Sequence, residues 1–170
     1  MSVLTIRVLP DPVLKRKARR VSLIDGSTKK LIDDMIETVH AVPGRAGLAA
    51  PQVGVSLRVI VLNVPEGEDT ALVNPEIVKR VGERLVDEGC LSIPGYFAEV
   101  KRSETVTVKG RDRNGAAVRI KGEGLLGQAL EHEIDHINGV LYIDHLESMD
   151  QLQKVEPNPL PAESDQAPAG

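Results

Sequence analysis

The sequence predicts an α+β fold in which a run of β-strands and two helices share one hydrophobic core. Three observations predict it. Apolar residues recur at helical spacing after residue 27, β-branched runs fill the middle of the chain, and helical spacing returns from residue 124 to residue 137. Strands grouped between helices, rather than alternating with them one by one, are typical of α+β domains.

Each element follows from a local signal. We expect the first helix to begin at Ser27, a plausible N-cap, and to end before Pro43-Gly44. β-type runs are predicted at 57–64, 71–73, 77–86, 105–109 and 116–121, the third continuing the sheet of the second. Arg113-Asn114-Gly115 predicts a hairpin turn between the last two runs, since Asn and Gly tolerate positive φ. The second helix is expected to end at Asn138-Gly139, a left-handed C-terminal stop.

The composition excludes several classes of protein. The chain has 170 residues, 41% of them hydrophobic and 27% charged, which suits one globular domain. We expect residues 1–150 to form that domain and residues 151–170, which are rich in proline, to be a disordered tail. The net charge of -4 and the 2% of aromatic residues disfavour a specific nucleic-acid partner. Since no apolar stretch is long enough to span a membrane, we expect a cytoplasmic protein with no membrane partner.

A basic cluster follows Pro10-Asp11-Pro12 near the N-terminus. Its members are Lys15, Arg16, Lys17, Arg19 and Arg20. Charge runs of this length are usually a solvated helix face, and we expect one here. Transient contact with a polyanion such as the ribosome is the alternative.

His132-Glu133-Ile134-Asp135-His136 is the segment most informative about chemistry. Histidines four residues apart on a helix project from one face at the separation that a single metal ion requires. Glu133 stands beside them and can exchange a proton with a water molecule on that metal. Apolar residues cover so much of the circumference of this helix that we expect it to be buried. Buried imidazoles need partners, so the segment predicts a metal site.

Two histidines do not complete a metal site, and the spacing leaves the third ligand open. A metzincin would place a histidine six residues after His136, where Tyr142 stands. A distant glutamate, as in other zinc peptidases, is compatible with the sequence. Cys90, the single cysteine, is the other candidate, and Gly89 beside it would let the backbone approach a site closely.

Three segments together resemble the signature motifs of the peptide deformylase family. They are Gly47-Leu48-Ala49-Ala50-Pro51-Gln52, Glu88-Gly89-Cys90-Leu91-Ser92 and His132-Glu133-Ile134-Asp135-His136. Pro10-Asp11-Pro12 with Leu14 also resembles the family's N-terminal segment, so the resemblance covers roughly residues 4–148. It implies an α+β fold with antiparallel sheets packed around a central helix that carries the His-Glu-x-x-His motif.

The resemblance implies a metal-dependent hydrolase that removes the N-formyl group from the N-terminal formyl-methionine of newly synthesised polypeptides. The implied metal is one Fe(II) per chain, with Zn, Ni or Co as substitutes. The implied ligands are Cys90, His132 and His136. Glu133 would position and deprotonate the attacking water. The side-chain amide of Gln52 and the backbone N–H of Leu91 would stabilise the negative charge that develops on the formyl oxygen.

The substrate itself needs room and an apolar pocket. Gly47 and Gly89 are expected to let the substrate backbone lie close. Leu125 and Ala129 lie two turns and one turn before His132 on its helix face, and we expect them to contact the methionine side chain. Ordinary helix packing is the alternative for each.

Two positions depart from the family pattern without touching a predicted ligand. Arg45 stands where a glycine is usual, which puts a long cation near the substrate entrance. Glu131 stands where glutamine is common, and it either accepts a hydrogen bond behind the site or faces solvent. Arg102 matches a family arginine, and we expect it to pair with Glu88 or Asp135 and to brace the site.

Two other functions stay open at this point. A zinc metallopeptidase of related chemistry would cleave unformylated peptides. A non-catalytic binding module would hold the metal in a closed structural site, with His40 or His145 as the fourth ligand, and would not need Glu133. Neither alternative explains the motifs that contain Gln52 and Cys90.

Overall fold

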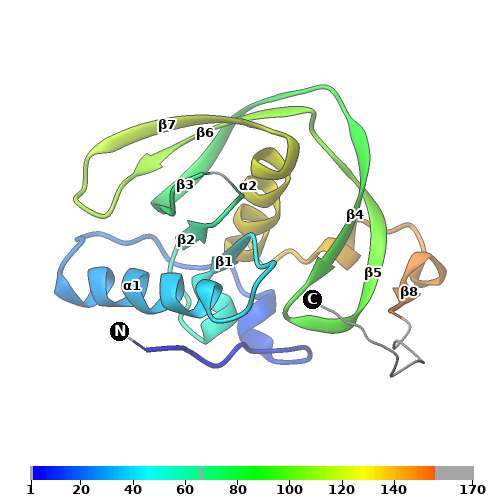
Figure 1. Cartoon of the computed structure of the whole chain (residues 1–170), viewed down its shortest axis with the longest axis horizontal. Helices are drawn as coiled ribbons and strands as arrows, with labels where there is room; N and C mark the ends of the chain where they lie inside the picture. Colours follow the sequence, from blue (N-terminus) through cyan, green and yellow to red (C-terminus); the bar gives the residue numbers. More distant parts are fainter. Residues whose placement is uncertain (1, 66, 156–170) are drawn as a thin grey trace.

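The structure is a computed structural model, which describes residues 2–65 and 67–155. Within them the chain forms two antiparallel sheets with the orders β1-β2-β3-β6-β7 and β4-β5-β8 (Figure 1). The strands are β1 (Gly47–Ala49), β2 (Val59–Leu62), β3 (Thr70–Val81), β4 (Arg84–Cys90), β5 (Ile93–Arg102), β6 (Thr105–Arg111), β7 (Ala117–Glu123) and β8 (Gln153–Lys154). The α-helices are α1 (Gly26–His40) and α2 (Gly124–Ile137). The short 3₁₀ turns are η1 (Pro12–Lys15), η2 (Ala50–Val53), η3 (Tyr142–His145) and η4 (Met149–Gln151).

Helix α1 covers one face of the larger sheet. Its N-cap is Asp25, whose carboxylate accepts hydrogen bonds from the backbone N–H groups of Ser27 and Thr28. The prediction of Ser27 as the N-cap was therefore wrong by two residues. The apolar cluster between α1 and the sheet contains Ile32, Met35 and Val39 of the helix and Leu48, Val59 and Val61 of the strands.

Helix α2 covers the opposite face of the same sheet. Val59 and Val61 of β2 belong to the apolar cluster of α1, whereas Ile60 and Leu62 belong to the cluster of α2, as the alternation of side chains along a strand requires. From α2 this cluster takes Ala129, Leu130, Ile134 and Ile137. The predicted helix bounds and burial are confirmed, and in Figure 1 α2 lies between the larger sheet and the strands β4 and β5.

The predicted strands differ from the structure in the middle of the chain. The run predicted at 77–86 is divided at Gly82, which adopts φ +70° between β3 and β4. Strand β4 then joins the second sheet instead of continuing the first. Strand β5 is not among the predicted runs, because its exposed polar and aromatic residues interrupt any apolar run. The hairpin is confirmed, because β6 and β7 pair in antiparallel register around a turn in which Gly115 has φ +89°.

The basic cluster near the N-terminus is exposed, but it is not a helix face. Of its residues only Lys15 belongs to a helical turn, η1. The chain then runs irregularly, held by backbone hydrogen bonds from Ala18 to Ile137 and from Arg19 to Ser56. Because Ala18 is buried between exposed neighbours, the segment lies flat against the domain rather than coiling.

The domain extends slightly beyond the predicted boundary at residue 150. Gln153 and Lys154 form β8, which pairs with Phe97 and Tyr96 of β5. The remainder of the predicted disordered tail, residues 156–170, lies outside the described residues. In the described ranges, no helix has the length and apolar character needed to cross a membrane.

Gly139 allows the chain leaving α2 to approach the N-terminal segment. Its φ is +77°, and a Cβ there would lie 2.7 Å from the backbone oxygen of Lys15. Gly139→Ala should lower the free energy of unfolding by more than about 2 kcal/mol. The alanine would have to adopt the left-handed conformation, which is unfavourable for it, and its Cβ would also collide with the backbone oxygen of Lys15. Gly115→Ala is the matched control, since a Cβ there meets nothing within 4 Å. Urea denaturation measures both losses, and equal losses would show that the contact with Lys15 is unimportant.

Candidate metal centre and catalytic cavity

Three metal-ligand atoms come together between α2 and the end of β4. Because α2 is regular here, His132 and His136 project from one face a single turn apart. Their Nε2 atoms are 3.2 Å apart, and the Sγ atom of Cys90 lies 3.3 Å from Nε2 of His136. In the part of the chain that the structure describes, these residues are the only group of three or more His, Cys, Asp or Glu whose ligand atoms all lie within 4.8 Å of one another. Two imidazoles and a thiolate suit a tetrahedral metal with one position open.

Glu88 and Arg102 hold His132 from behind. Nδ1 of His132 lies 2.7 Å from Oε1 of Glu88, which leaves Nε2 directed at the metal position. Arg102 donates two hydrogen bonds of 2.6 Å to the carboxylate oxygens of Glu88 and one of 2.8 Å to Asp135. Burial alone would raise the pKa of Glu88, but the hydrogen bonds from Arg102 and His132 outweigh it and lower this pKa to about 2. The pairing expected of Arg102 is confirmed, with both carboxylates rather than one.

The other residues considered as ligands have different partners. Nε2 of His145 lies 2.8 Å from Oδ2 of Asp135, so His145 is the outer end of the network that holds His132. Nε2 of His40 lies 2.8 Å from Oδ2 of Asp69. Tyr142, at the metzincin position, places its ring centroid 6.5 Å from that of His132. The group that could hold a metal ion is thus Cys90, His132 and His136, and no described feature supports His40 or His145 as a fourth ligand.

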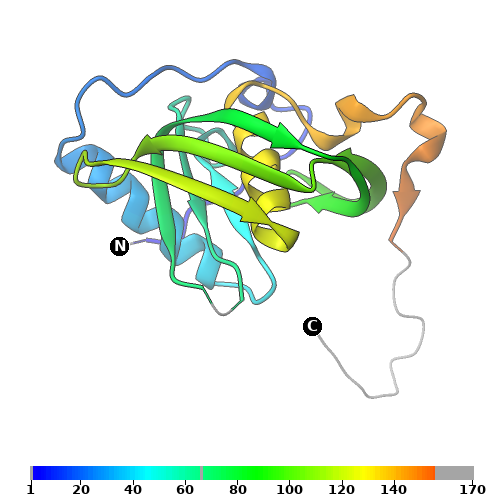
Figure 2. The same cartoon turned by 90° about the horizontal axis from the view of Figure 1, so that it is seen from above.

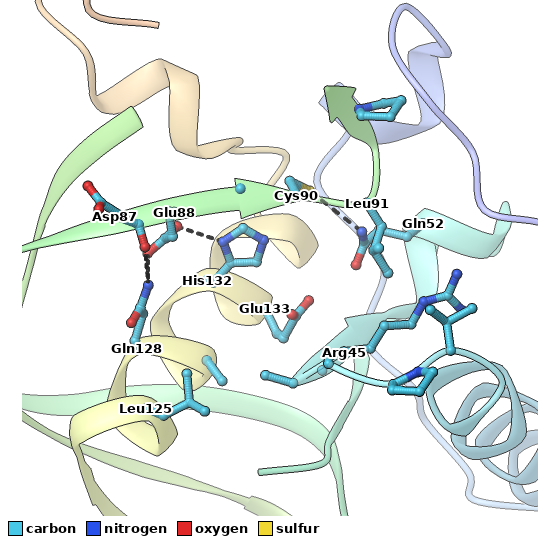
Figure 3. Close-up of a pocket in the computed structure, with 18 of the residues that line it drawn as sticks. Arg45, Gln52, Asp87, Glu88, Cys90, Leu91, Leu125, Gln128, His132 and Glu133 are labelled. Atoms are coloured by element: carbon cyan, nitrogen blue, oxygen red, sulfur yellow. Dashed lines mark hydrogen bonds and ion pairs between the residues drawn. The ribbon is translucent and has the colours of Figure 1, made fainter. Parts of the chain in front are cut away.

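Glu133 is buried beside the ligand atoms. Its exposed fraction is 4%, and its Oε1 atom has no hydrogen-bond partner among the described residues. Burial raises the pKa of this carboxyl to about 7, although the nearby charge of His132 opposes the rise. Figure 3 shows the carboxylate directed into the space between His132 and Gln52. A buried oxygen without a protein partner at this position is suited to a bound molecule.

Gln52 is oriented by its neighbours. The backbone N–H of Ala49 donates to its Oε1 atom at 3.0 Å, which turns the Nε2 atom toward Cys90 Sγ, 3.7 Å away, and Ser92 Oγ, 3.2 Å away. Ser92 also donates its backbone N–H to the sulfur of Cys90 at 3.4 Å. No pattern in the sequence predicts the contacts of Ser92 or of His145, although Ser92 lies within the second motif. Only the folded structure shows that these side chains support the site.

A cavity of about 570 Å³ opens onto the ligand atoms (Figure 3). The predicted site residues in its wall are Gly47, Gln52, Gly89, Cys90, Leu91, Leu125, Ala129, His132 and Glu133. His136 lies behind them with an exposed fraction of 1%. A Cβ at Gly47 would lie 2.9 Å from the backbone oxygen of Val61 and 3.1 Å from Glu133, so a side chain would not fit there. The structure therefore brings together every residue that the sequence analysis assigns to the site.

The two departures from the family pattern have structural explanations. Arg45 lines the cavity, but its Nη1 atom donates a 2.6 Å hydrogen bond to the backbone oxygen of Thr38 in α1. In Figure 3 the side chain runs away from His132. Glu131 is buried and accepts hydrogen bonds from the backbone N–H and hydroxyl of Ser103. It therefore links α2 to the end of β5 and does not face solvent.

These features define a class of protein: hydrolases that hold a metal between two histidines of one helix and a third protein ligand, with a glutamate beside the open position. The comparison with known families makes the class specific. The model of the family described as "Polypeptide deformylase" matches residues 3–152. The chain belongs to this family.

Individual relatives agree along most of the chain. It is 60% identical over 159 residues to the peptide deformylase of Dehalococcoides mccartyi strain CBDB1, which covers 93% of this chain and 95% of that one. Its structure is similar to a peptide deformylase from Legionella pneumophila, with a TM-score of 0.84, 46% identity, and coverage of 88% of this chain and 89% of that one. The enzyme from Ehrlichia chaffeensis in complex with actinonin has a TM-score of 0.85, 41% identity, and coverage of 89% and 92%. The peptide deformylase fold is confirmed, and the chain is a metal-dependent hydrolase of this family.

Breaking the pair between Glu88 and Arg102 should destabilise the fold, because their side chains are 4% and 3% exposed. Arg102→Met should lower the free energy of unfolding by about 3–5 kcal/mol, since it leaves a buried carboxylate without its cation. In a double-mutant cycle with Glu88→Gln, the two losses should deviate from additivity by about 2 kcal/mol or more.

The exposed pair of Glu76 and Lys109, at 64% and 56%, is the matched control for this cycle. Its coupling should stay below about 1 kcal/mol, as is usual for surface pairs. Additive losses at Glu88 and Arg102 would show that the buried pair does not brace the site.

Proposed function

We propose that the protein removes the N-formyl group from the N-terminal formyl-methionine of newly synthesised polypeptides and releases formate. One observation carries the proposal: the ligand atoms of Cys90, His132 and His136, the unpartnered oxygen of Glu133 and the amide of Gln52 converge beside one cavity. Hydrolysis of a formamide needs a metal position, a proton carrier and a donor for the developing negative charge. The site contains all three.

The residues present fit a metal ion. Three ligand atoms lie within 4.8 Å of one another, and Glu88 fixes Nε2 of His132 as the ligand atom by holding its other ring nitrogen. When bound, the metal supplies Lewis-acid chemistry, lowering the pKa of a water molecule and polarising the formyl carbonyl. We propose one Fe(II) per chain, with Zn, Ni or Co as substitutes that the same donors accept. With a thiolate among the ligands, the iron form should lose activity in air.

Glu133 is proposed as the proton carrier. Its carboxylate takes a proton from the attacking water and later delivers it to the leaving amine. Two features of the site support this role. The Oε1 atom is unpartnered among the described residues, and the absence of a side chain at Gly47 leaves space directly against the carboxylate.

Gln52 and the backbone N–H of Leu91 are proposed to stabilise the negative charge on the formyl oxygen. Both residues line the cavity next to Cys90. The amide of Gln52 cannot turn freely, because its oxygen accepts the backbone N–H of Ala49. A donor that is already oriented costs no reorganisation during the reaction, and one such donor typically contributes about 10²–10³ in kcat.

The remaining cavity residues are proposed to hold the substrate. Gly47 and Gly89 leave room for the peptide backbone, and Leu125 with Ala129 supplies an apolar wall for the methionine side chain. Leu125 is 46% exposed and lines the cavity, so its side chain is accessible to a substrate. A nascent formyl-methionyl chain as substrate favours a cytoplasmic enzyme, and transient contact with the ribosome stays a prediction.

Formate release is the direct test of the activity. Protein loaded with Fe(II) under anaerobic conditions should release formate from a formyl-methionyl tripeptide, and a chelator should abolish the release. The same peptide without the formyl group should stay intact. Cleavage of that unformylated peptide would favour the metallopeptidase alternative. Folded, fully metallated protein that releases no formate would contradict the proposal.

Glu133→Ala should separate metal binding from turnover. We expect kcat to fall by a factor on the order of 10² or more, because the proton carrier is lost, while the metal content measured by mass spectrometry stays at one ion per chain. Glu131→Gln is the matched control, since Glu131 is an equally buried glutamate two residues earlier that contacts Ser103 instead of the cavity. Its kcat should stay within about threefold of the unmodified protein. Undiminished turnover in Glu133→Ala would favour a structural metal site.

A further inference from the structure

Two adjoining hollows lie outside the catalytic cavity and share none of its lining residues. One, of about 310 Å³, lies between Arg58, Arg80 and the end of α2, and the other, of about 570 Å³, lies against β6 and β7. Both are lined by Arg20, Asn74 and Glu76, so they adjoin at these residues, and together they are called here the basic groove. In Figure 2 the strands β6 and β7 of the larger sheet cross in front of helix α2.

Cations dominate the lining of the basic groove. They are Arg20, Arg58, Arg80, Lys109, Arg111 and Arg119, and the acidic lining residue is Glu76. The groove is therefore positively charged, although the whole chain has a net charge of -4. A concave surface lined by one sign of charge concentrates the field and attracts the opposite sign.

This arrangement is unfavourable for the isolated fold. Lys109 and Arg119 stand directly opposite each other in the antiparallel register of β6 and β7, where like charges destabilise a sheet. Burial and the neighbouring charge of Arg20 lower the pKa of Arg58. Glu76 offsets part of this repulsion through its pair with Lys109 at 3.3 Å. Arg80 is likewise paired, with Glu131 at 3.1 Å, whereas no ion pair of the described residues includes Arg20, Arg58, Arg111 or Arg119. An anion bound in the groove would compensate these four cations.

We propose that the basic groove docks the sugar-phosphate backbone of RNA. Guanidinium groups bind phosphate oxygens through paired donors, and arginine supplies most of the cations here. Lys109 and Arg111 lie two residues apart on β6, and Arg119 of β7 stands opposite Lys109. These positions space the charges by about 5–7 Å, which suits a repeating polyanion. The described lining residues include no aromatic side chain, so the groove contacts the backbone and does not stack bases.

The choice of RNA rests on the proposed function. An enzyme that acts on newly synthesised chains works beside the ribosome, whose surface is largely RNA. Arg20 also belongs to the N-terminal basic cluster, for which contact with a polyanion was the alternative to a solvated helix. The structure places Arg20 in a folded groove with cations of β6 and β7 instead of on a helix.

Fluorescence anisotropy with a labelled RNA hairpin tests the proposal. The unmodified protein should bind it, and with about four phosphate contacts the affinity should fall by on the order of 10²-fold when KCl rises from about 50 to 200 mM. Arg20→Glu with Arg119→Glu should weaken binding at least about tenfold at the lower salt and should flatten the salt dependence. The matched control is Lys101→Glu with Lys154→Glu, which changes the net charge equally at exposed positions of the other sheet. It should change the affinity less than about threefold.

Several outcomes would overturn the proposal. They are no binding of the hairpin at about 50 mM KCl, an equal loss in both double variants, and stronger binding of polyglutamate or of phosphatidylglycerol vesicles than of RNA.

Formate release from the tripeptide should be the same in all three proteins, because none of the four substituted residues lines the catalytic cavity. Since binding and formate release are measured separately, failure of the groove and failure of the proposed function are distinguishable. Circular dichroism checks the fold, and Arg20→Ala with Arg119→Ala replaces the reversal variant if that one is misfolded.

Discussion

The candidate metal centre depends on the buried ion pair between Arg102 and Glu88. Removing both charges from water costs several kcal/mol per ion, so the pair is not retained for stability alone. It is compensated by two hydrogen bonds between its own groups and a third from Arg102 to Asp135. The pair fixes the orientation of His132, because the Nδ1 atom of this histidine is hydrogen-bonded to the carboxylate of Glu88. Among the described residues Glu88 is the hydrogen-bond partner of this Nδ1 atom, so the orientation of the ring depends on that carboxylate.

Two kinds of force therefore position helix α2. Apolar packing of Leu130, Ile134 and Ile137 against the larger sheet fixes where the helix lies, but such packing is non-directional and does not orient an imidazole. The polar network to β4 and β5 is directional, and it acts on the opposite side of the helix. Because Arg102 comes from β5 and Glu88 from β4, the smaller sheet sets the geometry of the site even though the larger sheet buries the helix.

Much of this could be predicted from the sequence, because the informative signals are local. Helix periodicity predicted α2, and the spacing of two histidines predicted that His132 and His136 would project together from one face of it. The division of the run 77–86 could not be predicted, since both halves have β-type residues and only the pairing with different partners separates them. The N-cap was misplaced because serine and aspartate are equally good caps, and only the contacts of Asp25 decide between them.

Contacts between distant segments were the least predictable part of the site. The third ligand stayed open on spacing alone, because Cys90 approaches the two histidines only after β4 packs beside α2. His145 was weighed as a ligand on residue type, yet it contacts Asp135 and lies three hydrogen bonds away from Glu88, through Asp135 and Arg102. The basic groove was hidden for the same reason: its cations come from the N-terminal segment, from the residue before β2, and from β3, β6 and β7, and a net charge of -4 conceals their grouping.

Arg45 shows how a departure from a family motif is accommodated without changing the cavity. Among the described non-glycine residues only Asn74 has positive φ, so position 45 does not require the conformational freedom of glycine. The guanidinium group donates to the backbone oxygen of Thr38, where the partial negative charge at the C-terminal end of α1 favours a cation. This arrangement also has an unfavourable free-energy contribution, because Nε of Arg45 is buried without a hydrogen-bond partner among the described residues. In return the cavity wall before β1 is tied to α1, and the charge is directed at the helix end instead of at the ligand atoms. The substitution therefore adds rigidity at the entrance while leaving the electrostatics around His132 and Glu133 to the residues of the motifs themselves.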